Sequence, residues 1–162
     1  MKNLFSKKVI IVLVIIVATI LALFNIFRSK NLSKTYLTSS NEEQRSFTGH
    51  YNQKVTGDSI KFDFKIFNGK WSVFEFDSPK DNKITIEDKS KINKGKFYIV
   101  VLDSNYKDVA IKEENENKNL EFVTPHKGKY LIRIVGKKAS GHFNIKVRSK
   151  ENIKMVYKDF WN

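Results

Sequence analysis

From Ser46 to the end of the chain, apolar and polar residues alternate in short runs. In residues 61–67, for example, Phe62, Phe64 and Ile66 alternate with charged side chains. Successive side chains of a strand point to opposite faces of a sheet, so such a run predicts one buried and one solvated face. Turns are expected between the runs, where turn-forming residues occur at positions 57–58, 68–69, 78–79, 93–95 and 104–105. The predicted strands are Phe47–Val55, Ser59–Phe67, Lys70–Phe76, Lys83–Glu87, Lys96–Leu102, Asp108–Lys112, Leu120–Val123, Lys129–Val135 and His142–Arg148.

Many short strands that follow one another closely and are separated by turn residues are typical of an antiparallel two-sheet protein. We therefore predict an all-β fold, an antiparallel β-sandwich of jelly-roll-like type, over residues 46–162. Residues 129–135 and 142–148 flank a short glycine-bounded segment, a pattern that predicts a hairpin. Residues 97–102 are apolar on both faces, which predicts a strand that is central in the sheet or covered on both sides.

The start of the chain has a different pattern. Residues 9–27 carry no charge and show no polar face, and an apolar helix of about 20 residues crosses a bilayer. The lysines of residues 1–8 suit both a signal peptide and an anchor. The apolar run is longer than a signal-peptide core, and no small-residue cleavage site follows it. We predict a signal-anchor helix over residues 9–27, with a short cytoplasmic tail before it and a linker over residues 28–45 after it.

Lysine and arginine residues flank the apolar run on both sides, so the charge bias sets the orientation only weakly. A very short leading tail before a long trailing domain favours translocation of that domain. We therefore expect a single-pass protein of the cell membrane with its C-terminal domain outside the cytoplasm. Within the linker we expect one helical turn, which starts at Ser40 and Asn41 before Glu42 and Glu43.

The segment 128–147, GKYLIRIVGKKASGHFNIKV, and the upstream segment 94–105, KGKFYIVVLDSN, carry a family resemblance. Over residues 94–148 the chain resembles the closing strands of bacterial pre-peptidase C-terminal-like (PPC-like) sandwiches, a hairpin pattern that other two-sheet sandwiches share. The resemblance implies a jelly-roll-like accessory domain of secreted proteins, used for attachment or targeting and not for catalysis. The chain departs from that family because the predicted anchor, and not a peptidase domain, stands before the sandwich.

The net charge of +13 favours polyanionic partners. The charges are interspersed with acids and form no basic block, a pattern that also fits a plain solvated surface. The expected partners are the membrane, through residues 9–27, and an anionic wall polymer, a glycan or another envelope protein; nucleic acid is not expected. The candidate contact residues stand on predicted solvated faces and in the C-terminal tail: Lys61, Lys65, Lys70, Lys146, Arg148, Tyr157, Phe160 and Trp161.

Aromatic residues make up 13% of the chain. Those in predicted strands are expected in the core rather than in a stacking platform for sugars or single-stranded nucleic acid; they are Trp71, Phe74, Phe76 and Tyr98. The aromatic tail, residues 152–162, is open to three interpretations: a last edge strand, a short amphipathic helix packed on the domain, or a segment that docks a partner or the membrane interface. Packing on its own domain is favoured, because isolated exposed apolar patches are uncommon.

No catalytic constellation is recognisable. His50, His126 and His142 are far apart in the sequence, and no hydrolase, phosphate-loop or zinc motif occurs. The chain has no cysteine, which excludes disulfides and thiolate metal sites. The loops at residues 77–82 and 103–108 are rich in oxygen ligands that suit calcium. We interpret them as turns built by Asp and Asn, and predict neither a cofactor nor a metal site.

Glutamates 113, 114 and 116 are interpreted as a charged turn rather than as a carboxylate pair. Taken together, the features predict a membrane-tethered, non-catalytic binding or assembly module of a bacterial cell envelope, and not an enzyme. One alternative is a single-pass component of a larger membrane complex of secretion, sporulation or immunity, in which the span itself makes specific contacts. A hydrolase that acts on cell-wall material is least favoured, because it would need a catalytic constellation.

Overall fold

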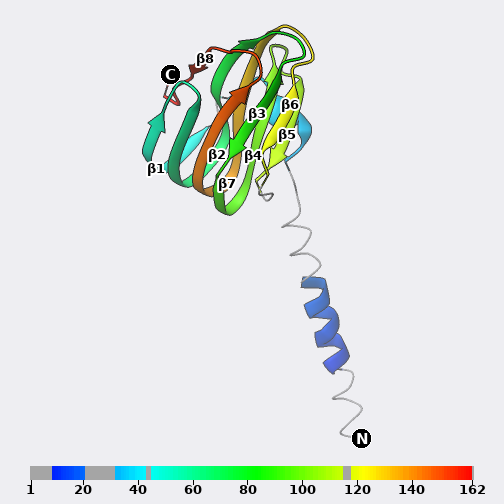
Figure 1. Ribbon diagram of the computed structural model, residues 1–162. Helices are drawn as coiled ribbons and strands as arrows, with labels where there is room; N and C mark the ends of the chain where they lie inside the picture. The colour runs from blue at the N-terminus through cyan, green and yellow to red at the C-terminus, as the bar shows by residue number, and fades with distance from the viewer. Residues whose placement is uncertain (1–8, 21–31, 43–44, 115–117, 162) are drawn as a thin grey trace, which may run out of the picture. The chain divides into compact units, whose positions relative to one another are not determined.

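The computed structural model (Figure 1) describes residues 9–20, 32–42, 45–114 and 118–161. The chain divides into two compact units, Met1–Leu32 and Ser33–Asn162. In the first unit, residues 9–20 form a helix whose apolar side chains are exposed. Within the described residues, no helix combines the length and the apolar character that a membrane crossing needs. Residues 1–8 and residues 21–27 of the predicted span lie outside the described residues.

The second unit is mostly antiparallel β structure, as the alternation predicted. After one short helix, α2 (Lys34–Thr38), its described residues form eight strands joined in a single hydrogen-bonded sheet (Figure 1). The strands are β1 (Ser46–Val55), β2 (Ser59–Ser78), β3 (Lys83–Asp88), β4 (Lys91–Asp103), β5 (Asp108–Glu113), β6 (Leu120–Val123), β7 (Gly128–Ser149) and β8 (Met155–Tyr157).

Two long strands, β2 and β7, run antiparallel to each other and change their outer neighbours halfway. Residues 60–68 of β2 pair with β1, and residues 145–149 of β7 pair with β3, which in turn pairs with β6. Further along, β2 pairs with β8, and β7 pairs with β4, whose other neighbour is β5. We call these two groups the β1 half (β1, β3, β6) and the β4 half (β4, β5, β8).

The two long strands bend so that the inner faces of the halves meet. The ring centroids of Phe62 and Trp71, both on β2, lie 5.6 Å apart. Nine residues of straight strand would separate them by about 30 Å, so β2 folds back on itself between them. Phe97 of β4 and Phe143 of β7 are also 5.6 Å apart across the core. The bend coincides with register shifts between Phe64 and Gly69.

Between the halves lies one apolar core that is rich in aromatic rings. Trp71, Phe74 and Phe76 point into it, and Tyr98 is buried on the other face of β4, so the prediction that these strand aromatics are buried is confirmed. The indole nitrogen of Trp71 donates to the carbonyl of Lys158 at 2.9 Å. The aromatic tail is therefore part of this packing.

The tail supplies an edge strand and one core residue. Its strand β8 pairs with β2, and the Phe160 ring lies 5.3 Å from that of Trp71. Phe160 is 4% exposed, whereas Trp161 is 74% exposed. The favoured interpretation, a tail that packs on its own domain, is confirmed, and its form is a last edge strand rather than a helix.

The predicted hairpin is wrong. Residues 129–135 and 142–148 belong to one continuous strand, β7, that pairs with β2 along its length. The expected turns at residues 68–69 and 93–95 likewise lie inside β2 and β4. Glycine at positive φ serves a bulge or a bend as well as a turn, and Gly69 (φ 98°) and Gly95 (φ 81°) are used in this way.

Residues 33–42, which we call the covering segment, lie against the outer face of the β4 half. The Ser33 side chain caps α2 by accepting from the backbone nitrogen of Tyr36 at 3.2 Å, so the helix begins at Lys34 and not at Ser40 as predicted. Leu37 is buried, and residues 97–102 are buried on both faces, which confirms a strand covered on both sides. The folded unit thus begins within the segment that the sequence predicted as a linker.

Candidate functional site

The structure brings four of the predicted contact residues together on one surface. Lys61 on β2 and Lys146 and Arg148 on β7 alternate with buried residues, so they point outward from the β1 half. The two strands are adjacent there, with Ser59 opposite Lys146. Lys65 is exposed too, but the predicted alternation ends beside it: Ile66 is exposed and not buried with Phe62 and Phe64, because the register of β2 shifts between Phe64 and Phe67.

Ion pairs divide these four cations into two kinds. Lys146 lies 3.3 Å from the carboxylate of Asp58, and Arg148 pairs with Glu87. No carboxylate among the described residues lies within ion-pair distance of Lys61 or Lys65. Lys65 therefore has no carboxylate partner among the described residues, whereas Lys61 acts on the Asp63 carboxylate from beyond ion-pair distance.

Beside Lys65, the outer face is hollowed into a groove of about 510 Å³. It runs where β1, β2, β4 and β7 approach one another. Gly141 forms part of its floor, because a Cβ there would lie 3.0 Å from the Cα of Ile92. The lining residues are Tyr51, Asp63, Phe64, Lys65, Lys91, Asn93, Ser140, Gly141 and His142.

A hydrogen-bonded chain fixes one wall of the groove. Nδ1 of His142 lies 2.6 Å from Oδ1 of Asp63, and the Asn52 amide donates to Oδ2 of Asp63 at 2.7 Å. Asn52, at φ 57°, sits where the register of β1 shifts. The hydrogen bond from Asn52, followed by that from His142, holds the pKa of Asp63 below its usual value. The carboxylate is thus ionised and both of its oxygens are occupied.

The groove is equipped mainly with hydrogen-bond donors. Lys65 and Lys91 supply ammonium groups, Tyr51 is 43% exposed, and Asn93 and Ser140 add an amide and a hydroxyl. In the part of the chain that the structure describes, no serine hydrogen-bonds to the other ring nitrogen of His142. The geometry suits recognition of anionic or hydroxyl-rich ligands more than nucleophilic catalysis, which needs a base held against its nucleophile.

The other predicted contact residues lie elsewhere. Lys70 is 7% exposed, because the covering segment lies over its face of β2, and Phe160 is in the core; neither is a surface residue. The Tyr157 hydroxyl on β8 accepts from the Gln53 amide at 2.9 Å. Of the three predicted contact residues in the tail, Trp161 is the one that is largely exposed to solvent.

The remaining histidines are structural. Nε2 of His126 lies 3.3 Å from Asp103, and the His50 ring stacks on Phe47. Burial lowers the pKa of His50. The oxygen-rich loops form turns, as predicted: Asp103 accepts from the backbone nitrogen of Asn105 at 2.8 Å. Among the described residues no group of three or more His, Cys, Asp or Glu side chains could hold a metal ion.

Two clusters of charged residues were not predicted from the sequence. Glu114, interpreted as part of a charged turn, has a buried side chain that lies with those of Asp88 and Lys112. Arg133 is fully buried and pairs with Glu42, 91 positions away, at 2.7 Å. The only signal for either was the single arginine inside the apolar run of residues 130–135.

Comparison with protein-family models, curated proteins and solved structures finds no match to this chain. The resemblance to PPC-like sandwiches stays a prediction, and the hairpin on which it rested is a bent strand.

Proposed function

We propose that this protein is a membrane-tethered, non-catalytic binding module outside the cytoplasm, and that its groove binds an anionic polymer of the cell envelope. The observation that carries the proposal is the pair of lysines, Lys65 and Lys91, that line the groove without a carboxylate partner among the described residues. Such cations favour the binding of a polymer with regularly spaced negative charges, because the polymer can lie along an open groove and form ion pairs with them.

The neighbouring groups support the same class of ligand. Lys61 and Lys65 lie on the same face of β2, because they are an even number of positions apart along the strand. The exposed Tyr51 ring and the Asn93 and Ser140 side chains match the hydroxyl groups of a sugar or polyol backbone. Because these contacts are exposed and ionic, binding should weaken as salt concentration rises.

The membrane tether over residues 9–27 and the jelly-roll-like fold type are further parts of this proposal. Support for the tether comes from the uncharged sequence of residues 9–27, of which residues 9–20 are helical with exposed apolar side chains. The two facing halves and the single core between them support classification of the folded unit as a jelly-roll-like β-sandwich.

The test is binding of the full chain, in detergent micelles, to fluorescently labelled poly(glycerol phosphate), followed by fluorescence anisotropy. We expect the double variant Lys65→Gln/Lys91→Gln to weaken binding about tenfold or more, which corresponds to about 1.4 kcal/mol. The matched control is Lys80→Gln/Lys127→Gln, which removes the same charge from exposed turn lysines outside the groove.

The control should change the dissociation constant less than twofold. Equal weakening by the two double variants would mean that net charge alone attracts the polymer and would contradict a binding site in the groove. Absence of binding by the unmodified chain at low salt would contradict an anionic polymer as the ligand.

A further inference from the structure

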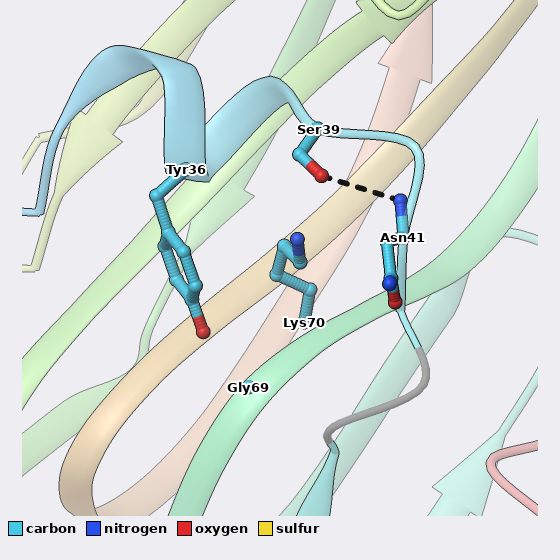
Figure 2. Close-up of a pocket in the computed structure, with 5 residues that line it drawn as sticks. All are labelled: Tyr36, Ser39, Asn41, Gly69 and Lys70. Carbon is cyan, nitrogen blue, oxygen red and sulfur yellow. Dashed lines mark hydrogen bonds between the residues drawn. The ribbon is translucent and has the colours of Figure 1, made fainter.

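A second, smaller pocket lies on the β4 half, between the covering segment and β2. Its volume is about 200 Å³, and its lining residues are Tyr36, Ser39, Asn41, Gly69 and Lys70 (Figure 2). Pockets for drug-sized ligands have volumes of roughly 300–1,000 Å³. This pocket therefore has room for one small ion or one charged group, and it shares no lining residue with the groove.

Lys70 is the most unusual group in the pocket. It is 7% exposed, and its ammonium group lies over the Tyr36 ring, 4.7 Å from the ring centroid. In Figure 2 the side chain lies inside the pocket with its nitrogen toward Ser39. No carboxylate among the described residues lies within ion-pair distance of it. Burial of an ammonium group without a counter-charge is costly, and a cation–π contact offsets only part of that cost.

The nearest carboxylate is already committed to other partners. Glu42 Oε1 accepts from Nε of Arg133 at 3.0 Å and from the Ser72 hydroxyl, and its Oε2 accepts from the Ser72 backbone nitrogen at 3.2 Å. Arg45 lies 3.6 Å from the same Oε2. Glu42 is thus bonded to Arg133 and Ser72 and is not within ion-pair distance of Lys70, and the nearby Arg133 adds positive charge.

We propose that this pocket binds a small oxyanion, a phosphate or carboxylate group, with the Lys70 ammonium group as its principal donor. The Ser39 hydroxyl accepts from the Asn41 backbone nitrogen at 3.3 Å, which leaves its own hydrogen to donate into the pocket. An oxyanion there supplies the missing counter-charge and forms charge-assisted hydrogen bonds, which are stronger than neutral ones. The proposal does not rest on the function proposed for the groove.

The pocket also predicts how binding depends on pH. Desolvation lowers the pKa of Lys70, the positive charge of Arg133 lowers it further, and Glu42 opposes them. Lys70 therefore loses its proton at a lower pH than an ordinary lysine. Anion binding is present below that pKa and is lost as the pH rises through it.

The experiment measures thermal unfolding of the full chain in detergent micelles at constant ionic strength, with sodium chloride replaced stepwise by inorganic phosphate, glycerol phosphate or acetate. A ligand that binds only the folded state raises the melting temperature with its concentration. We expect at least one of these anions to do so for the wild type and for Lys70→Arg. For Lys70→Met the apparent affinity should fall at least tenfold. Lys80→Met, which removes an exposed turn lysine outside both the pocket and the groove, is the matched control and should respond as the wild type does.

The three anions separate the sources of the charged group. A response to inorganic phosphate supports a free ion, a response to glycerol phosphate alone supports a phosphate ester, and a response to acetate alone supports a carboxylate. Equal responses of wild type and Lys70→Met, or no response of the wild type to any of the three, would overturn the proposal. Broadening of the ³¹P resonance of phosphate by the wild type, and its loss in Lys70→Gln, checks binding without reliance on stability.

Discussion

The outer faces of the two halves are built on the same two long strands, β2 and β7, but one face is exposed to solvent and the other is covered. On the β1 half, Arg148 of β7 is 61% exposed in its side chain and pairs with a surface glutamate. On the β4 half, Arg133 of the same strand has a side chain that is 0% exposed. The residue type, the strand and the outward direction are shared. The covering segment and the Tyr106 ring, whose centroid is 5.3 Å from the guanidinium carbon, lie over Arg133 but not over Arg148. The cover and not the strand therefore decides which face can meet a ligand.

Arg133 also shows how the cover is held in place. Its Nη1 donates to the carbonyls of Leu37 at 3.2 Å and of Ser39 at 2.8 Å, and its guanidinium group pairs with Glu42. These partners are spread across the covering segment, so one buried cation fixes where the segment lies. A buried pair of this kind adds more to specificity than to net stability, but removal of one partner is costly.

The largest expected effect comes from breaking this contact. We expect Arg133→Ala to lower the free energy of unfolding by about 3–5 kcal/mol, because Glu42 loses its main partner and two carbonyls lose their donor. Urea unfolding of the full chain, followed by tryptophan fluorescence, measures it, since Trp71 lies in the core. The matched control, Arg148→Ala, removes an arginine from an exposed ion pair and should leave the midpoint unchanged. If the two variants unfolded alike, the contrast between the faces would have no energetic basis.

A smaller effect is expected where the two halves join. Gly136 of β7 lies opposite Gly69 of β2, and a Cβ at Gly136 would lie 2.9 Å from the Phe67 carbonyl oxygen and closer still to its ring. Gly136→Ala should therefore cost about 1–3 kcal/mol through overpacking. Gly57→Ala, where a Cβ meets nothing within 4 Å, is the control for the change in backbone entropy. Stability of Gly136→Ala equal to that of Gly57→Ala would contradict a tightly packed bend.

The positions of most strands were predictable because alternation is a local property. Residues 120–123, for example, form a strand with the bounds that the sequence indicated. The continuity of β7 was not predictable, because the glycines at 136 and 141 fit a loop as well as they fit a bend. The sequence says which residues point outward, but the distinction between a turn and a bend depends on the partner strand.

The candidate sites divide in the same way. The outward direction of Lys65 and His142 followed from alternation, and the structure places both in the groove. The burial of Lys70 was not predictable, because it depends on a covering segment that the sequence presented as a polar linker. The contact of Asn52 with Asp63 depends on a bulge in β1, for which no local signal exists.

A third region, between the halves, sharpens the contrast because its charges are buried without a covering segment. Asp88 ends β3 of the β1 half, and Lys112 lies on β5 of the β4 half; Glu114 follows β5. Nζ of Lys112 lies 2.9 Å from Glu114 and also pairs with Asp88. Burial, followed by the neighbouring Asp88 carboxylate, raises the pKa of Glu114 to about 8. Lys112 thus contacts two carboxyl groups, and that of Glu114 is protonated at neutral pH.

The smallest predicted effect follows from this shift. A glutamate at its ordinary value of 4.5 releases its proton in the unfolded chain, whereas folded Glu114 holds it up to about pH 8. The folded state binds more protons in that window, so the contribution of Glu114 to stability falls as the pH rises from about 5 to 8, by ~1–2 kcal/mol after screening by solvent. The lowered pKa of Asp88 acts below this window and the raised pKa of Lys112 acts above it.

Urea midpoints of the wild type and Glu114→Gln between pH 5 and 8 isolate this contribution, because every other residue is common to both proteins. We expect the midpoint of the wild type to fall relative to that of Glu114→Gln as the pH rises. Glu87→Gln, which removes a glutamate from the exposed pair with Arg148, should leave the pH profile of the wild type unchanged. Parallel profiles for all three proteins would mean that Glu114 is ionised throughout. Burial would then change the charged groups of this third region no more than exposure changes those of the β1 half, and the contrast between the two regions would be lost.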